Sequence, residues 1–105
     1  IEYMVNSHPH IVETAVIPVI NGNSIKKELK ITLVKVNNKA ITHQEVSDFL
    51  YHNLAYFQVP RYIEFREKIP KGPSTEISKS ILIKEWNEKK SRNNIWDFVT
   101  RNFLE

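Results

Sequence analysis

A capped helix between two β-rich stretches constrains the fold of this chain most strongly. The segment Thr42-His43-Gln44-Glu45 fits a capping box, in which a threonine and a glutamate three residues later satisfy each other's backbone N–H groups. Apolar residues then recur at helical spacing, and Pro60 disfavours a helical residue before it, so we expect the helix to end by residue 59. The apolar face consists of Val46, Phe49, Leu50 and Leu54.

Two stretches before this helix have the composition of strands. Residues 11–20 (IVETAVIPVI) are rich in β-branched side chains, and Asn21-Gly22-Asn23 is a turn signal. Residues 29–36 alternate apolar and polar side chains up to Leu33, which is typical of a half-buried strand. The alternation changes at Val34, so either both faces are covered there or a bulge intervenes. Together the two stretches predict a hairpin with a long turn.

The remaining segments complete an α+β fold, of mixed α/β character. We expect helices over residues 1–7, 77–86 and 94–104, and a third strand over 62–66. The last helix would begin at an Asn94 cap and present Ile95, Phe98, Val99 and Phe103. The predicted architecture is a small three-stranded sheet flanked by helices, in the order α-β-β-α-β-α-α.

Composition excludes several classes of protein. The 105 residues correspond to one domain, and the absence of cysteine excludes disulfide scaffolds, cysteine-ligated zinc and thiol catalysis. The net charge of +3 is spread among interleaved acids, which favours a solvated surface over a nucleic-acid groove. No apolar run approaches the ~20 residues of a membrane span. We expect no metal site, because the His8-Pro9-His10 pair is better explained as a loop, and we take a cytoplasmic location as the default.

A stiff loop over residues 70–79 is the most distinctive polar segment. Two prolines flank its single glycine, so it could project a side chain into another protein's site, or simply connect a strand to a helix. Its polar residues are Lys71, Ser74, Thr75, Glu76 and Lys79.

Four motifs in order resemble the C-terminal subdomain of the adenylate-forming acyl-CoA synthetases. They are HPHIVETAVIPV at residues 8–19, a strand, a threonine-capped helix ending in LAYFQVPRYIEF at 54–65, and IPK at 69–71. The resemblance covers residues 1 to about 84. The amino-acid sequence of residues 54–65 is similar to that of the crotonobetaine/carnitine-CoA ligase subgroup.

The resemblance implies a mobile domain of an ATP-dependent acyl-CoA ligase. Such enzymes join a carboxylate to ATP, with Mg²⁺, as an acyl-adenylate and then transfer the acyl group to the thiol of CoA or of a carrier protein. The implied partner is an N-terminal adenylation domain of the same chain. We expect residues 1–105 to be one subdomain cut from a longer protein and inactive alone, with a family core at 1–88 and a helical extension at 89–105.

The resemblance also suggests functional residues, with one departure. In a gap-free alignment, Ser74 and Thr75 lie beside Glu76, which occupies the place of the family's catalytic lysine. A carboxylate there would repel the phosphates that the lysine neutralises. Lys79 or Lys71 could substitute, the loop could have been altered, or the protein could be weak in adenylation.

For the thioester step, the matching residues are Phe57, Gln58 and Arg61. Arg61 could pair with a CoA phosphate and Phe57 could pack on CoA, or the two could be surface and core residues.

Two further hypotheses remain open. The chain could be a degenerate, non-catalytic module that docks a carrier protein or another partner, with Glu76 as its main support. Alternatively, the basic charge and the aromatic residues could belong to a small RNA-binding domain, although the expected aromatic motif of such domains is absent.

Overall fold

The computed structural model describes residues 8–20, 27–36, 41–55, 59–73, 76–88 and 94–104. The helix expected over residues 1–7 lies outside these ranges, as does the turn expected at residues 21–23.

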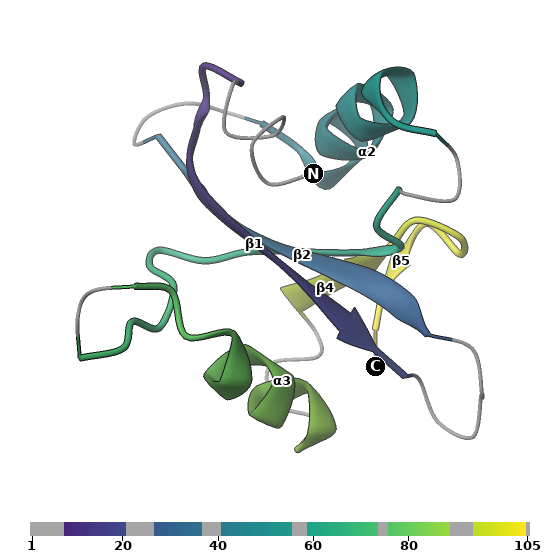
Figure 1. Cartoon of the computed structure of the whole chain (residues 1–105). Helices are drawn as coiled ribbons and strands as arrows, with labels where there is room; N and C mark the ends of the chain where they lie inside the picture. The colour runs from purple at the N-terminus through teal and green to yellow at the C-terminus, as the bar shows by residue number, and fades with distance from the viewer. Residues whose placement is uncertain are drawn as a thin grey trace.

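The described residues form a five-stranded mixed sheet in the order β1-β2-β3-β4-β5 (Figure 1). β1 (Ile11–Val19) and β2 (Glu28–Lys35) pair antiparallel, which confirms the predicted hairpin. β3 (Tyr62–Phe65) pairs parallel to β2. β4 (Ile95–Asp97) pairs antiparallel to β3, and β5 (Asn102–Phe103) pairs antiparallel to β4.

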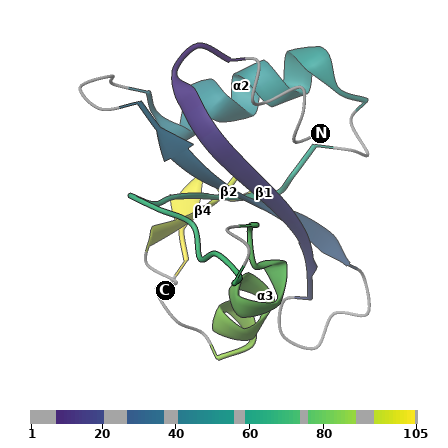
Figure 2. The same cartoon turned by 60° about the vertical axis from the view of Figure 1, so that its left-hand side comes forward.

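The two described helices cover opposite faces of the sheet (Figure 2). α2 (His43–Asn53) connects β2 to β3, and its Val46 and Leu50 pack into one buried cluster with Ile31, Leu33 and Ile63. α3 (Lys79–Asn87) follows β3 on the other side. Its cluster contains Ala15, Ile17, Tyr62, Leu82, Trp86 and Ile95. Each face of the sheet therefore has its own core.

The predicted capping box is present at the start of α2. The Thr42 hydroxyl accepts a hydrogen bond from the backbone N–H of Glu45 at 3.1 Å, and the Glu45 carboxylate accepts one from the backbone N–H of Thr42 at 3.4 Å. The helix ends with Leu54 as its C-cap, before Pro60 as expected. The third helix was predicted two residues early, since α3 begins at Lys79.

Burial on both faces of β2 explains the change of alternation at Val34, and a separate β-bulge lies opposite it on β1. Ile11 pairs with Lys35 but Glu13 pairs with Val34, so Val12 is an extra residue on β1. The extra residue moves the following side chains to the opposite face. Ile11 therefore packs on the α2 side, whereas Ala15 packs on the α3 side.

The expectation of a half-buried β2 is wrong, because both of its faces are covered. Lys30 and Thr32, on the α3 side, are 2% and 0% exposed. Burial of Lys30 is tolerated because its ammonium group donates a hydrogen bond to the Glu64 carboxylate of β3 at 2.7 Å. Glu64 is itself 3% exposed, so this is a buried ion pair between neighbouring strands.

The predicted three-stranded sheet and the predicted last helix are also wrong. Residues 95–97 and 102–103 are strands, and Ile95 and Trp96 pack into different clusters on opposite faces. A turn over residues 98–101 joins them, with Arg101 in the left-handed region at φ 58°. Pairing with the backbone of β3 stabilises the extended form, a long-range effect that local apolar spacing does not encode.

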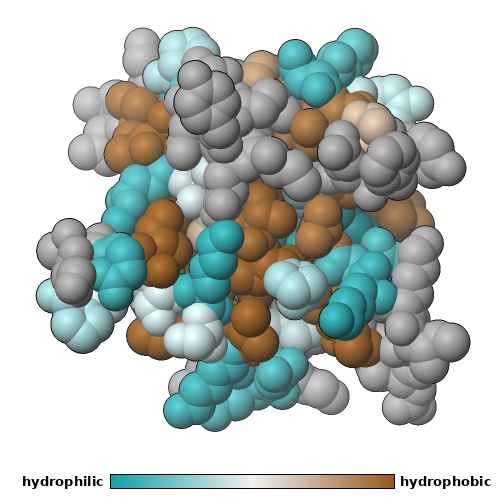
Figure 3. Space-filling model, viewed as in Figure 1, coloured by the Kyte–Doolittle hydropathy of each residue, from teal (hydrophilic) through white to brown (hydrophobic). Residues whose placement is uncertain are grey.

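The surface in Figure 3 is mixed in character. Hydrophobic atoms are visible near the middle of that view, and hydrophilic residues predominate at the bottom, around α3. None of the helices in the described ranges has the length and apolar character needed to cross a membrane.

Candidate functional site

The polar loop after β3 begins and ends in a short backbone stem. Lys71 and Ile77 form an antiparallel bridge. The Gly72 N–H donates to the Glu76 carbonyl at 2.7 Å, and the Ser78 N–H donates to the Pro70 carbonyl at 2.8 Å. The segment before the loop tip is therefore tied to the segment after it. Ser74 and Thr75 lie outside the described residues.

Glu76 and Lys79 both lie on the surface at the end of this stem. Glu76 is exposed, and a β-carbon at Gly72 would collide with its carboxyl group, so that group lies against the Gly72 backbone. Lys79 is the first residue of α3 and is also exposed. The loop thus carries a carboxylate where the family motif predicts a cation, with a lysine three residues later.

Lys71 is held at the stem by an ion pair with β1. Its ammonium group donates a hydrogen bond to the Glu13 carboxylate, which lies 58 residues earlier in the sequence. About a third of each side chain is exposed (35% for Lys71 and 31% for Glu13). The structure places all three predicted residues close together in the chain. Lys71 and Glu76 lie in the loop, and Lys79 begins the helix that follows it.

Arg61 lies elsewhere, beside β4. Its Nε and Nη2 donate to the two carboxylate oxygens of Asp97 at 2.9 and 3.0 Å, and its Nη1 lies 3.8 Å from Glu28. The hydrogen bonds to Asp97 raise the pKa of Arg61. Burial alone would raise the pKa of Asp97, but hydrogen bonds from Arg61 and from the Val99 and Thr100 backbone lower it below its ordinary value.

Phe57 and Gln58 lie outside the described residues. Tyr62, an aromatic residue that follows this segment, is fully buried and packs against Trp86 with ring centroids 4.9 Å apart. It therefore belongs to the core and offers no stacking platform.

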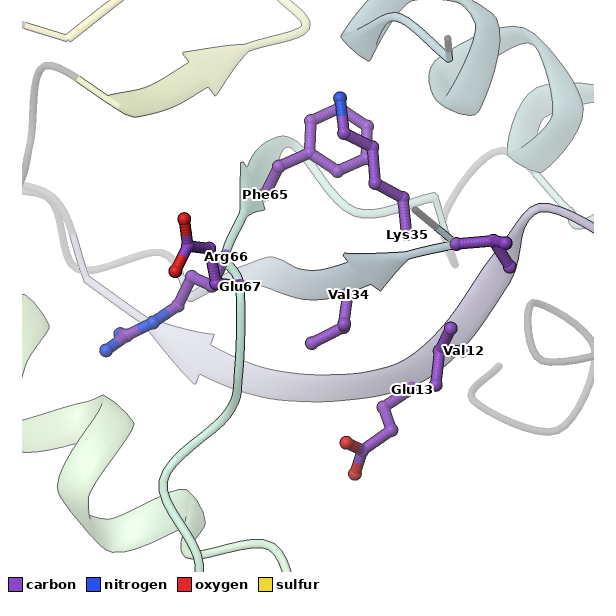
Figure 4. A pocket seen from close by; sticks show the side chains of 8 residues that line it. Val12, Glu13, Val34, Lys35, Phe65, Arg66 and Glu67 are labelled. Atoms are coloured by element: carbon purple, nitrogen blue, oxygen red, sulfur yellow. The ribbon is translucent and has the colours of Figure 1, made fainter. Parts of the chain in front are cut away.

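A pocket of about 1060 Å³ opens where β1 bulges from β2 and β3 ends (Figure 4). Figure 4 shows Lys35 and Phe65 directed to one side of the strands, with Val34 and Glu13 directed to the other. A smaller pocket of about 330 Å³ lies beside it and includes Lys71 in its lining. The larger pocket is lined by Val12, Glu13, Val34, Lys35, Val36, Phe65, Arg66 and Glu67.

Sequence reasoning missed three charged residues that shape these regions. Glu13 lies in the motif HPHIVETAVIPV, but the motif does not indicate that its side chain contacts Lys71 of the loop. Arg66 bonds to Glu85 of α3 at 2.5 Å, and Asp97 holds Arg61. No local signal marked either contact, because each partner is at least 19 residues away.

An aromatic cluster surrounds the start of α2. The His43 ring lies 4.6 Å from Phe65 and 5.0 Å from Phe103, centroid to centroid. Burial, followed by the charge of Lys35, lowers the pKa of His43. Both effects favour the neutral form of the His43 imidazole. In the described part of the chain, no group of three histidine, aspartate or glutamate side chains is arranged to hold a metal ion.

A family described as "AMP-binding enzyme C-terminal domain" matches residues 1–76, which is well over half of the chain. The chain belongs to this family. The matched range includes β1, β2, α2, β3 and the loop as far as Glu76. It ends before α3 and the β4–β5 hairpin, so Asp97 lies beyond the range that carries the family pattern.

Curated relatives of this domain are acyl-CoA ligases. A 4-coumarate–CoA ligase 1 from Solanum tuberosum is 29% identical over 82 residues, which cover 78% of this chain and 15% of that protein. A crotonobetaine/carnitine–CoA ligase from Proteus mirabilis (strain HI4320) is 32% identical over 83 residues, covering 78% and 16%. The chain thus spans less than a fifth of the length of these relatives.

The fold of this chain is also similar to parts of solved structures. Apo MatB from Rhodopseudomonas palustris has a TM-score of 0.76 at 23% identity, over 84% of this chain and 17% of that one. An acyl-CoA synthetase from Brucella canis has a TM-score of 0.74 at 26% identity, over 84% and 17%. The first likeness establishes the fold alone.

Proposed function

We propose that this domain works as the mobile C-terminal part of an ATP-dependent acid–thiol ligase. The whole enzyme would convert a carboxylate and ATP to an acyl-adenylate and then to a thioester with CoA. The observation that carries the proposal is the family match across β1, α2, β3 and the loop. The relatives are CoA ligases, of whose length this chain spans less than a fifth.

The domain would act with an N-terminal adenylation domain of the same chain, in the cytoplasm. That partner would bind ATP, with Mg²⁺, and the acid. Residues of this chain would approach the reaction through the loop at 70–79. In this division of labour the isolated domain has no activity of its own, and residues 1–88 form the family core.

The charges of the loop are only partly suited to binding the phosphates of ATP. A triphosphate requires cations, and Lys79 supplies one near the stem, whereas Lys71 is paired with Glu13. The exposed carboxylate of Glu76 has the wrong sign for an α-phosphate under attack by a carboxylate. We propose that Lys79, at the start of α3, takes the role of the family lysine, with Ser74 and Thr75 beside the phosphates.

A second face would serve the thioester step. Phe57, Gln58 and Arg61 align with the stretch that approaches CoA in related ligases. Asp97 already engages Nε and Nη2 of Arg61, so a CoA phosphate would be met by Nη1 in place of its 3.8 Å contact with Glu28. A quarter of the Arg61 side chain remains exposed (26%), which leaves room for that contact.

The test compares the two half-reactions in the protein that joins this domain to an adenylation domain. ATP–pyrophosphate exchange reports adenylation, and acyl-CoA formation from supplied acyl-adenylate reports the second step. If the proposal holds with a relocated lysine, the wild type exchanges pyrophosphate and Lys79→Ala abolishes exchange while sparing thioester formation. Lys84→Ala, an exposed lysine further along α3, is the matched control.

Glu76 also favours a second candidate function, a degenerate module that docks a carrier protein or another partner without catalysis. In that case the wild type shows no ATP–pyrophosphate exchange. Recovery of exchange in Glu76→Lys would identify a loop that has lost its cation and a natural role in thioester formation or binding. Silence of both half-reactions in wild type and Glu76→Lys would leave the docking module as the function.

A further inference from the structure

The stem of the loop that carries Glu76 contacts the sheet through a charged side chain as well as through Ile69 and Ile77, which pack on the α3-side core. Lys71, in the stem, donates to the carboxylate of Glu13 on β1. The pair joins segments that are 58 residues apart. Both residues belong to the sequence motifs that identify the family, one in HPHIVETAVIPV and the other in IPK. The contact therefore links two parts of the family pattern.

The bulge in β1 is what aims Glu13 at the loop. With regular alternation, Glu13 would share the face of Ile11, which packs on the α2 side. The extra residue at Val12 moves Glu13 to the face of Ala15, where α3 packs. Figure 4 shows the result, with the Glu13 side chain on the same side of the strands as Val34.

The stem transmits the position of Lys71 to Glu76. The backbone bridge of Lys71 and Ile77 lies next to the 2.7 Å hydrogen bond from the Gly72 N–H to the Glu76 carbonyl. The Glu76 carboxyl group also lies against Gly72. A movement of Lys71 relative to β1 therefore carries the site of the family lysine with it.

We propose that Glu13 is a positioning residue of the ligase, and that its ion pair with Lys71 sets the place of the loop for adenylation. This inference rests on the proposed function of the domain. Lys71 then acts through its contact with Glu13, and the cation for the phosphates comes from elsewhere in the loop. A relocated catalytic role for Lys71 is the competing explanation.

The first test measures the loop itself, by hydrogen exchange of the full-length protein at peptides spanning residues 70–78. Loss of a partly exposed ion pair worth up to about 1 kcal/mol raises the open-to-closed equilibrium constant by up to about fivefold, so Glu13→Gln should speed exchange of the stem amides by a similar factor. Glu67→Gln, which removes an exposed carboxylate from the lining of the larger pocket, is the matched control and should leave the rate unchanged. Unchanged exchange in Glu13→Gln would overturn the proposal.

The second test separates positioning from catalysis by exchanging the charges. Glu13→Gln should lower the rate of pyrophosphate exchange by about fivefold with little change in the KM for ATP, and should spare thioester formation from acyl-adenylate. Lys71→Glu alone should be worse, since it opposes two carboxylates. The double variant Glu13→Lys with Lys71→Glu should recover most of the rate, because it restores the pair.

The outcomes distinguish this inference from the proposed function. A double variant as slow as Lys71→Glu would show that Lys71 meets the reactants directly, and Glu13 would lose its positioning role. A wild type silent in both half-reactions, and also in the Glu76→Lys background, would refute the ligase assignment. The hydrogen-exchange comparison would then still decide whether the pair holds the loop.

Discussion

The buried ion pair between Lys30 and Glu64 yields the sharpest stability prediction. Their side chains are 2% and 4% exposed, and the ammonium nitrogen lies 2.7 Å from the carboxylate. Removing one partner leaves the other charge in a low-dielectric core, which costs about 3–5 kcal/mol of unfolding free energy. We therefore expect Glu64→Leu to destabilise the protein by about 4 kcal/mol.

The two single substitutions should differ, because the partners have different surroundings. Glu64 also lies 3.9 Å from Nη1 of Arg66, which can partly compensate its charge when Lys30 is removed. Arg66 also bonds to Glu85 at 2.5 Å, a contact that neither substitution removes. Lys30→Met should therefore cost less than Glu64→Leu, by about 1–2 kcal/mol.

The double variant is the decisive measurement. Replacing a buried pair by apolar residues of similar volume is neutral or stabilising, so Lys30→Met with Glu64→Leu should match or exceed wild-type stability. Urea denaturation followed by tryptophan fluorescence reports both cores, because Trp86 lies on the α3 side and Trp96 on the α2 side. A loss below about 1 kcal/mol in Glu64→Leu, or additive losses in the double variant, would refute the argument.

Three further outcomes follow from individual contacts. Thr42→Ala should lower the unfolding free energy by about 1 kcal/mol through loss of the helix cap, and Thr42→Ser should restore it in the same denaturation assay. The folded-state pKa of Asp97 is lowered mainly by Arg61 against the effect of burial, so its stabilisation is present above the unfolded value of about 3.9 and is lost as pH falls through the folded value. Thermal melts should then lose stability in acid more steeply in wild type than in Asp97→Asn, and equal slopes would contradict this. The His43 imidazole should titrate below 6.5 by NMR, and Lys35→Met should move that midpoint upward.

The sequence was sufficient for the elements whose signals are local. The capping box and the apolar spacing located α2, and β-branched composition located the β1–β2 hairpin. It was insufficient where a distant partner decides the structure. Lys30 was expected to face solvent, but Glu64 on the adjacent strand makes its burial possible. The same reason explains the last segment, where pairing with β3 converts an apparently amphipathic helix into strands.

The same distinction between local signals and distant partners applies to the predicted site residues. Lys71, Glu76 and Lys79 lie together because they are close in sequence, and their role in a site stays a prediction. The contact of Arg61 with Asp97, 36 residues later, could not be predicted from the sequence, and a role for Arg61 toward a phosphate stays a prediction. The role of Glu13 depends on a bulge at Val12 of β1, whereas the sequence raised a bulge only as an alternative at Val34 of β2.

The chemistry of the loop is separable from its geometry. The stem is held by backbone groups, through the bridge of Lys71 with Ile77 and the hydrogen bond from Gly72 to the carbonyl of Glu76. The side chain at position 76 is exposed and takes no part in either contact. A change of residue type there can therefore remove or restore a cation without altering the fold, because exposed substitutions away from such contacts shift stability by only about 0.5 kcal/mol. Glu76 thus bears on what the domain does and not on whether it folds.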